Sequence, residues 1–220
     1  MGESGPVRSR FARIWPHVIL IAGIVTVVFP FLWMFATSFK QGADIYSISL
    51  IPKQPTLRNF VHLLENTMYP RWFLNSLIIA AIVTASELFF DSMAGYALAK
   101  LPFPGRNVVF ILILSTLMIP TEMLIIPWFL MFTKTGWIDT YWGVMLPGLI
   151  SAFGVFLMRQ FLQSIPDDLL NAGRIDGLNE FGVWWHVALP NIRPALAALA
   201  ILVFLGNWNA YLWPVIAIES

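Results

Sequence analysis

The chain has 220 residues, of which 58% are hydrophobic and 11% are charged, whereas soluble domains average roughly half and a quarter. These proportions exclude a soluble domain of comparable size, and several uncharged runs reach the length of about 20 residues that a membrane-spanning helix needs. The formal net charge of +1 gives no reason to expect nucleic acid as a partner. We therefore predict an all-α fold, that of a polytopic helical membrane protein.

The N-terminal part of the chain predicts a short tail and one membrane span. Residues 1–13 are polar and basic, and we interpret them as a cytoplasmic tail that precedes a transmembrane domain over residues 14–220. Residues 14–39 carry no formal charge, and this run is longer and bulkier than the apolar region of a cleaved signal peptide. It is therefore expected to be an uncleaved first span, which Pro30 kinks or ends.

A hydrophilic connection follows at residues 40–71, in which 57–65 can fold as a short amphipathic helix. Pro120 and Pro127 are expected to kink the third of five spans. After the first span, the others are expected at about 72–99, 107–132, 140–158 and 194–218.

The distribution of Lys and Arg predicts the orientation of these spans. If the N-terminus lies inside, the inner segments hold eight Lys and Arg residues and the outer segments hold five. Because basic residues gather on the cytoplasmic side of membrane proteins, we expect a cytoplasmic N-terminus. The polar interruption at residues 163–193 would then face the cytoplasm.

This interruption is too polar to lie in hydrocarbon, and it carries signals for two short helices. Ser164, Asp167 and Asp168 are typical of a helix start, because a hydroxyl can cap free N–H groups and carboxylates favour the positive helix end. Gly177 can adopt the left-handed conformation that ends a helix, and a second helix is expected at 179–187. These features alone are also compatible with an ordinary capped loop.

The sequence IPDDLLNAGRIDGL at residues 165–178 resembles the cytoplasmic EAA signature of ABC importer permeases, and more narrowly that of the carbohydrate (maltose-type) family. The stretches GYALAKLPFPGR at 95–106 and GNWNAYLWP at 206–214 resemble the same family, in the same order along the chain. The resemblance implies that 14–220 is a permease domain with the signature in a cytoplasmic coupling segment, 163–193. The residues that it assigns to ATPase coupling are Asp168, Leu169, Asn171, Ala172, Gly173, Arg174, Asp176, Gly177 and Phe181.

The resemblance also implies partners and a place in the cell. It implies a multi-pass subunit of a bacterial or archaeal inner membrane that pairs with a second permease subunit. A separate ABC ATPase dimer would bind ATP, and an extracytoplasmic solute-binding protein would deliver a sugar. The chain itself would be non-catalytic, with no metal and no directly bound cofactor; accordingly, it has no G-x-x-x-x-G-K-[ST] phosphate loop and no H-E-x-x-H motif.

The chain departs from the family pattern at a few positions. The glutamate of the signature falls on Asn171, its second alanine on Gly173, and the alanine after Asp-Gly on Leu178. The last of the family's six spans has no counterpart, so we expect a C-terminal truncation of roughly one loop and one helix.

Polar residues inside the predicted spans are candidates for a translocation path. Glu87 and Asp91 lie on one helical face, and a carboxylate inside a span costs on the order of 2.5–3.5 kcal/mol. They can instead be paired within the bundle or lie near the cytoplasmic interface. Asn207, Trp208 and Asn209 can bind and stack on a sugar, or can pack between helices.

Two other functions remain open from the sequence. One is an ABC permease for a different small solute, because such permeases share the signature. The other is a proton-coupled secondary transporter in which Glu87 and Asp91 relay protons.

Overall fold

The structure, a computed structural model, describes residues 10–218 of the chain. Within these residues the regular secondary structure is entirely helical, which confirms the predicted all-α class. The chain divides into two compact units, 1–71 and 72–220, and each is described by itself.

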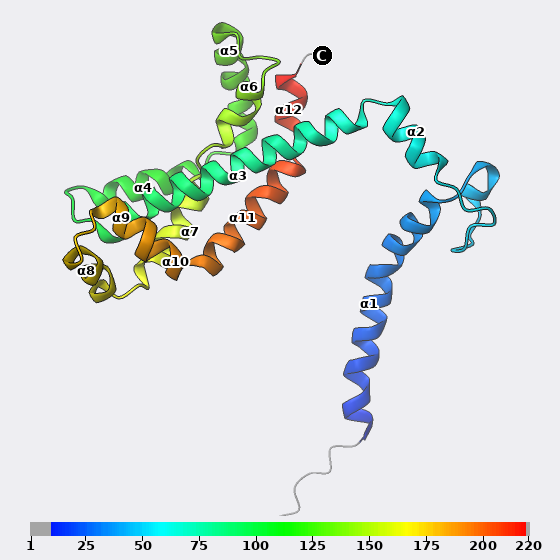
Figure 1. Cartoon of the computed structure of the whole chain (residues 1–220), viewed down its shortest axis with the longest axis horizontal. Coiled ribbons are helices and arrows are strands. Elements are labelled where there is room, and N and C mark those ends of the chain that lie inside the picture. The colour runs from blue at the N-terminus through cyan, green and yellow to red at the C-terminus, as the bar shows by residue number, and fades with distance from the viewer. Residues whose placement is uncertain (1–9, 219–220) are drawn as a thin grey trace, which may run out of the picture. The chain divides into compact units, whose positions relative to one another are not determined.

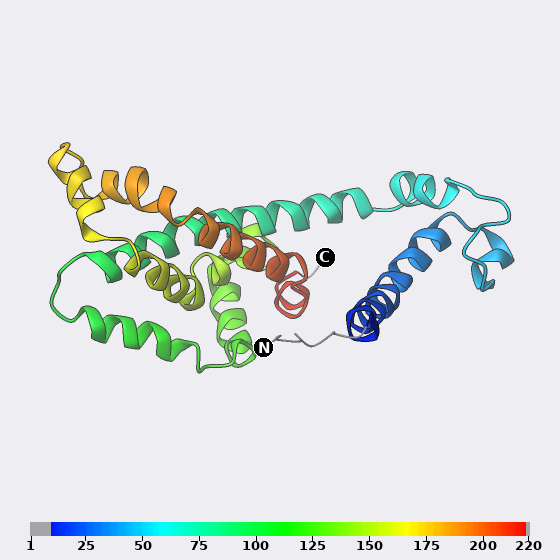
Figure 2. The same ribbon diagram turned by 90° about the horizontal axis from the view of Figure 1, so that it is seen from below.

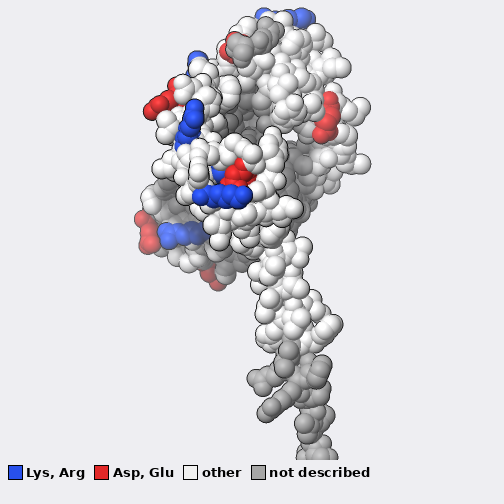
Figure 3. Space-filling view, turned by 90° about the vertical axis from the view of Figure 1, so that its right-hand side faces the viewer, with Lys and Arg blue, Asp and Glu red and all other residues white. Residues whose placement is uncertain are grey.

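The first unit contains α1 (Arg10–Ser38), the short η1 (Gly42–Tyr46) and α2 (Arg58–Asn66). Residues 10–13 of the expected tail are already helical, whereas residues 1–9 lie outside the described part. The sequence left open whether Pro30 kinks or ends the first span. α1 continues through Pro30 to Ser38, so Pro30 does not end the helix. Residues 15–38 of α1 carry no charged side chain, and this stretch is white in the space-filling view (Figure 3), as expected for a helix in lipid.

A folded connection follows α1. The Lys40 side chain is fully buried, and its Nζ donates to the Ser47 carbonyl oxygen at 3.0 Å. Asn59 of α2 donates through Nδ2 to the carbonyl oxygens of Ser38 and Lys40, at 2.9 and 2.8 Å. These bonds satisfy carbonyl groups that the end of a helix leaves free, so the connection is ordered rather than an open loop.

The second unit is organised along one long helix, α3. Figures 1 and 2 show α8 and α9 together at the C-terminal end of α3, whereas α5, α6 and α12 lie together away from that end. In chain order the helices are α3 (Tyr69–Lys100), α4 (Arg106–Thr116), η2 (Thr121–Leu124), α5 (Ile125–Thr135), α6 (Tyr141–Met145), η3 (Leu146–Gly148), α7 (Ala152–Gln163), α8 (Asp167–Ile175), α9 (Glu180–Val183), the π-helix η4 (Trp184–Ala188), α10 (Leu189–Asn191), α11 (Arg193–Trp208) and α12 (Leu212–Ala217).

Within residues 10–218, two helices are long and apolar enough to cross a membrane alone, at Trp15–Ser38 and Tyr69–Lys100. Three further pairs of helices reach that length only together, and each pair is bent. The bends are 87° between Arg106–Thr116 and Thr121–Thr135, 43° between Tyr141–Gly148 and Ala152–Gln163, and 84° between Glu180–Asn191 and Arg193–Trp208. The five expected spans fall on these elements, and their limits in a membrane stay predictions.

The helix ends differ from the expected span ends in three places. Pro120 lies at the break of the third span, but Pro127 lies in the first turn of α5, where its missing N–H removes no helix hydrogen bond. The fourth span was expected to end at residue 158, but its second helix, α7, continues to Gln163. The last expected span is not one helix, because α11 ends at Trp208 and α12 begins at Leu212.

The core of the second unit joins α3 and α7 to the polar interruption and to α11. It includes Tyr96 of α3, Leu162 of α7, Leu170 of α8, Trp184 of the π-helix and Leu199 of α11. Burial of one such leucine contributes about 1.5–3 kcal/mol where it is removed from water. The interruption is thus anchored in the same core as the spans.

Candidate functional site

The first helix of the polar interruption, α8, has a buried face and an exposed face. On the buried face, the Leu170 side chain packs in the core and Gly173 is also buried. Ile175 is 85% exposed, and Leu169 is also exposed, so apolar side chains remain on the outer face beside the polar ones. The exposed residues of α8 and its C-cap are Asp167, Asp168, Leu169, Asn171, Ala172, Ile175 and Asp176.

The start of α8 differs from the sequence prediction. Pro166, not Ser164, is the N-cap residue, and the Ser164 hydroxyl donates to the Phe161 carbonyl oxygen at 2.7 Å. Ser164 therefore closes the end of α7 instead of opening α8. Asp167 and Asp168 occupy the first turn of α8, as expected for carboxylates at the positive helix end.

Gly177 reverses the chain after α8. Its φ is +88°, in the left-handed region, which confirms the predicted conformation. The Leu178 N–H donates to the Gly173 carbonyl oxygen at 3.0 Å, which closes the end of the helix. No atom lies within 4 Å of a Cβ built at Gly177, so glycine is favoured here by backbone conformation and not by lack of space.

Gly173 lies where the family signature has an alanine, and the packing gives a reason for the difference. A Cβ at this position would lie 3.0 Å from Val187 Cγ2 and 3.5 Å from Leu178 Cδ1. The first of these distances is tighter than ordinary van der Waals contact. Because Val187 of the π-helix faces this position, the absence of a side chain at Gly173 lets α8 approach the π-helix closely.

Arg174 connects the two short helices. Its Nε and Nη2 donate to the two carboxylate oxygens of Glu180 at 2.8 and 3.1 Å, and its Nη1 donates to Asn171 Oδ1 at 2.7 Å. The Tyr96 hydroxyl of α3 donates to Glu180 Oε2 at 2.7 Å. A bidentate Arg–carboxylate pair fixes direction as well as distance, so this network sets the orientation of α8 relative to α9 and α3.

A second tie joins α8 to the end of α3. Lys100 Nζ donates to the Ile165 carbonyl oxygen and to Asp167 Oδ1, both at 2.6 Å. The Lys100 side chain is 7% exposed and that of Asp167 is 75% exposed, so a buried ammonium group lies under an exposed carboxylate. The hydrogen bond from Lys100 lowers the pKa of the Asp167 carboxyl below its usual value.

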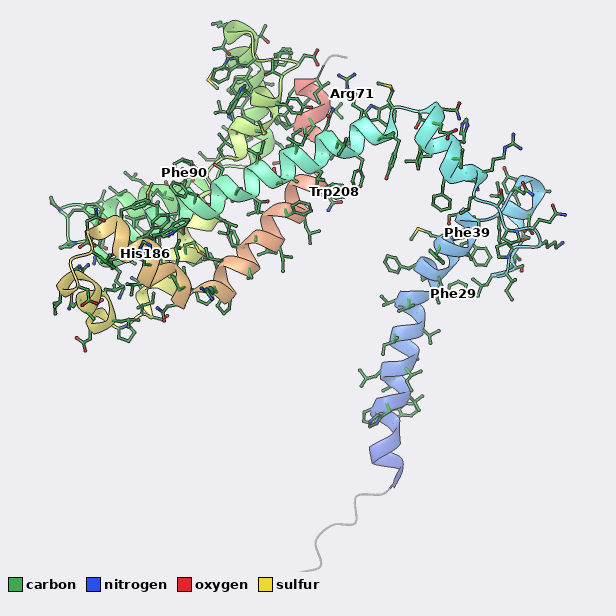
Figure 4. The ribbon with its side chains drawn as sticks, viewed as in Figure 1. Phe29, Phe39, Arg71, Phe90, His186 and Trp208 are labelled. Carbon is green, nitrogen blue, oxygen red and sulfur yellow. The ribbon has the colours of Figure 1, made fainter. Side chains whose placement is uncertain are left out.

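The second helix of the interruption is not the single α-helix expected at 179–187. Asn179 caps α9 by accepting a hydrogen bond from the Gly182 N–H at 2.8 Å, but the helix widens into a π-helix from Trp184 to Ala188. The buried Trp184 ring packs 5.0 Å from Phe181 and 5.3 Å from Phe89 of α3, between ring centroids. In Figure 4, His186 lies among the side chains at this end of α3.

The residues considered for a translocation path fall into two groups. Glu87 and Asp91 are buried on α3, and Asp91 accepts hydrogen bonds from the N–H and the hydroxyl of Ser151. Asn207 and Asn209 donate to carbonyl oxygens one turn earlier in the chain.

Trp208 contacts aromatic rings. Its centroid lies 5.2 Å from that of Phe73 on α3 and 5.9 Å from that of Phe204, and Figure 4 shows it beside α3. The contact with Phe73 joins α11 to α3, as inter-helix packing does, whereas Phe204 lies one turn earlier on α11 itself. A role in solute passage stays a prediction.

Sequence reasoning missed three residues that hold the interruption in place, namely Tyr96, Lys100 and Glu180. Tyr96 and Lys100 are distant in sequence from their partners, so no local pattern identifies them. Glu180 lies six residues from Arg174 across a turn, where helical spacing rules do not apply. Among residues 10–218, no group of three or more His, Cys, Asp or Glu side chains is arranged to hold a metal ion.

Comparison with curated proteins identifies similar permeases. The chain is 40% identical over 198 residues to the arabinooligosaccharides transport system permease protein AraQ of Halalkalibacterium halodurans, with 88% of this chain and 71% of that protein covered. It is 33% identical over 215 residues to the sn-glycerol-3-phosphate transport system permease protein UgpE of Yersinia pestis bv. Antiqua (strain Antiqua), with 94% and 76% covered.

A solved structure has the same fold. It is a crystal structure of a bacterial ABC transporter involved in the import of the acidic polysaccharide alginate, and one of its chains matches with a TM-score of 0.87 and 27% identity. The match covers 98% of this chain and 78% of that chain.

Residues 91–219 match the family described as binding-protein-dependent transport system inner membrane component. This range includes Asp91, the whole polar interruption and α11. Together with the relatives above, the match confirms the resemblance found in the sequence. The chain belongs to this family of inner membrane permease components of ABC importers.

Proposed function

We propose that this chain is the transmembrane permease subunit of an ATP-driven importer for sugars or oligosaccharides. In this proposal the segment 163–193 docks on a separate ABC ATPase dimer, and the N-terminus is cytoplasmic. A second permease subunit completes the path through the membrane, and an extracytoplasmic solute-binding protein supplies the sugar. The chain itself binds no ATP and catalyses no reaction.

The observation that carries the docking role is the outer face of α8. It combines exposed apolar side chains, Leu169 and Ile175, with exposed carboxylates, on a helix whose other face is buried in the core. Lys100 of α3 binds Asp167 of α8 directly, and Tyr96 of α3 reaches α8 through Glu180 and Arg174. A rigid, half-apolar helix at the end of the bundle is suited to fit a groove of a partner protein.

The substrate class is supported by the names of the relatives. AraQ belongs to an arabinooligosaccharide system, and the structural relative to a transporter for a polysaccharide. UgpE belongs to a system for sn-glycerol-3-phosphate, so another small polar solute is the alternative within the same family. Membership in this family favours binding-protein-dependent transport over the proton-coupled mechanism considered from the sequence.

Cross-linking tests the docking role directly, because the chain contains no cysteine. Ile175→Cys, on the outer face of α8, is compared with Met118→Cys, which is also highly exposed but lies between α4 and η2. In the assembled complex, a short bifunctional reagent is expected to join the ATPase subunit to the first variant and not to the second. A failure of every exposed position between 165 and 187 to cross-link would contradict the proposal.

Binding measurements test the substrate class. The solute-binding protein encoded beside this chain is screened by calorimetry against oligosaccharides, sn-glycerol-3-phosphate and amino acids. Tight binding of an oligosaccharide is expected. Binding of only a non-sugar solute would keep the permease role and reject the sugar.

A further inference from the structure

The fourth span is interrupted between η3 and α7, and side chains of α3 bind the interruption. The Ser86 hydroxyl donates to the Leu149 carbonyl oxygen at 2.7 Å. Asp91 accepts from the Ser151 N–H at 3.1 Å and from the Ser151 hydroxyl at 3.1 Å, and that hydroxyl accepts from the Gly154 N–H at 2.9 Å. Backbone groups that a broken helix leaves free inside a membrane need such partners.

Asp91 is held there by close packing as well as by hydrogen bonds. Its side chain is fully buried, and a Cβ built at Gly154 would overlap Asp91 Oδ2. One turn further on both helices, a Cβ at Gly95 would lie 2.8 Å from Met158 Cβ. At Gly95 the backbone of α3 therefore lies directly against that of α7, and at Gly154 the Asp91 carboxylate fills the space between the two helices, so both turns are closely packed.

The contacts continue from this point to the coupling segment. Arg159 Nε of α7 donates to the Leu98 carbonyl oxygen at 3.2 Å, and Lys100 Nζ donates to the Ile165 carbonyl oxygen at 2.6 Å. Along this series of contacts the sequence position rises on α3 and on α7 in the same direction, so the two helices run parallel. Ser86 and Asp91 make the contacts farthest from α8 in this series, and Asp91 is the one that binds the N-cap residue of α7, Ser151.

We propose that Asp91 is a positioning residue that fixes the beginning of α7 on α3, so that both helices move as one body with the coupling segment. Without the carboxylate, α7 can slide along α3, and a displacement of α8 is absorbed between the two helices. This role differs from solute contact or proton relay, because the Asp91 carboxylate faces the start of α7. The source of the displacement rests on the proposed function; the attachment of α7 to α3 does not.

Distance measurements test the attachment in the full importer complex. Spin labels are placed on Phe90→Cys of α3 and Phe153→Cys of α7, both of which are exposed large side chains, and Phe90 is marked in Figure 4. Pulsed dipolar spectroscopy is expected to give one narrow distance that is the same without nucleotide and with trapped ATP. Asp91→Leu is expected to broaden it. A shift on ATP binding with Asp91 intact, or an unchanged distribution in Asp91→Leu, would overturn the proposal.

A double-mutant comparison tests its consequence for coupling. Gly154→Ala and Asp91→Ala are each expected to lower sugar uptake per ATP hydrolysed by about tenfold. Gly154→Ala acts mainly on the Asp91 carboxylate, because Asp91 Oδ2 is the atom nearest the added methyl group and Ser151 Oγ is farther, at 2.9 Å. It should therefore add little in the Asp91→Ala background; additive losses would reject the proposal. Asp91→Asn keeps one acceptor and is expected to fall between wild type and Asp91→Ala, which also provides a test if the larger changes prevent assembly.

The two proposals fail in different ways. If the wild-type complex shows no ATP-dependent uptake, the proposed function is wrong, whereas the distance between the labels still decides the attachment. If uptake is normal but Asp91→Leu changes neither the distance nor the coupling, only the role of Asp91 is wrong.

Discussion

The Tyr96 hydroxyl donates a hydrogen bond of 2.7 Å to Glu180 Oε2, although the two residues are 84 positions apart in the sequence. Glu180 also binds Arg174 through both carboxylate oxygens. One carboxylate thus connects α3, α8 and α9. The orientation of α8, the proposed docking helix, thus depends on Tyr96 of the long helix α3.

Removal of this connection is expected to weaken coupling without preventing assembly. Glu180→Gln should lower sugar uptake per ATP hydrolysed by about threefold, and Tyr96→Phe by less, because a charge-assisted bond contributes more than a neutral one. The measurement is uptake and ATP hydrolysis in proteoliposomes. Glu65→Gln, an exposed change on α2, is the control. Equal ratios for Glu180→Gln and the control would show that the connection has no part in coupling.

The left-handed turn at Gly177 gives a second expectation. A β-branched side chain at a φ of +88° costs about 1–2 kcal/mol, so Gly177→Val should displace α9 from α8 and uncouple hydrolysis from uptake. Gly177→Asn should be milder, because asparagine tolerates this conformation.

Gly136 provides the matched control for Gly177. It has a φ of +70° at the end of α5, and a Cβ there also meets no atom within 4 Å. Gly136→Val should lower the thermal midpoint of the complex by a similar amount but keep uptake per ATP. Normal sugar uptake by Gly177→Val would count against the assignment of the coupling segment.

Asn171 stands where the family signature has glutamate, and its Oδ1 accepts from Arg174 Nη1 at 2.7 Å. Asn171→Glu keeps an acceptor for Arg174 three residues away on the helix and adds a charge to the outer face. We expect ATP-coupled uptake to stay intact or to increase. Asn171→Gln adds length without charge, so it separates the effect of the longer side chain from the effect of the added charge. A loss of uptake in Asn171→Glu alone would mean that the added charge disturbs docking.

Packing around Gly173 gives a fourth expectation. Gly173→Ala places a methyl group 3.0 Å from Val187 Cγ2, and this overpacking should destabilise the complex by about 1 kcal/mol. Val187→Ala should restore the thermal midpoint of Gly173→Ala, because it removes the opposing methyl groups. If Gly173→Ala is as stable as wild type, α8 is free to shift and the close packing is not needed.

Local features of the sequence were sufficient to predict the helical membrane class and the polar segment at 163–193, whereas the assignment of this segment to coupling came from the resemblance to the permease family. Uncharged runs define spans, and a run rich in Asp, Asn and Arg cannot lie in lipid; both are properties of consecutive residues. The turn at Gly177 was predictable for the same reason, since only glycine adopts that φ without cost. The helix start at Ser164 was wrong, because Pro166 caps α8 and Ser164 closes α7.

The tertiary structure alone decided how the segment is held and where the spans break. Asp91 with Ser151 and Lys100 with Asp167 are pairs separated by 60 and 67 residues, and each forms only when α3 lies against α7 and α8. The break before α7 combines a local cap, in which the Ser151 hydroxyl accepts from the Gly154 N–H, with distant partners on α3, Ser86 and Asp91. After the break that follows α11, Trp213 of α12 donates to the distant Gly143 carbonyl oxygen at 3.1 Å. The sequence by itself therefore determined which segment is too polar for lipid, and the folded chain determined which residues fix this segment to α3, because fixation depends on contacts between residues that are far apart in the sequence.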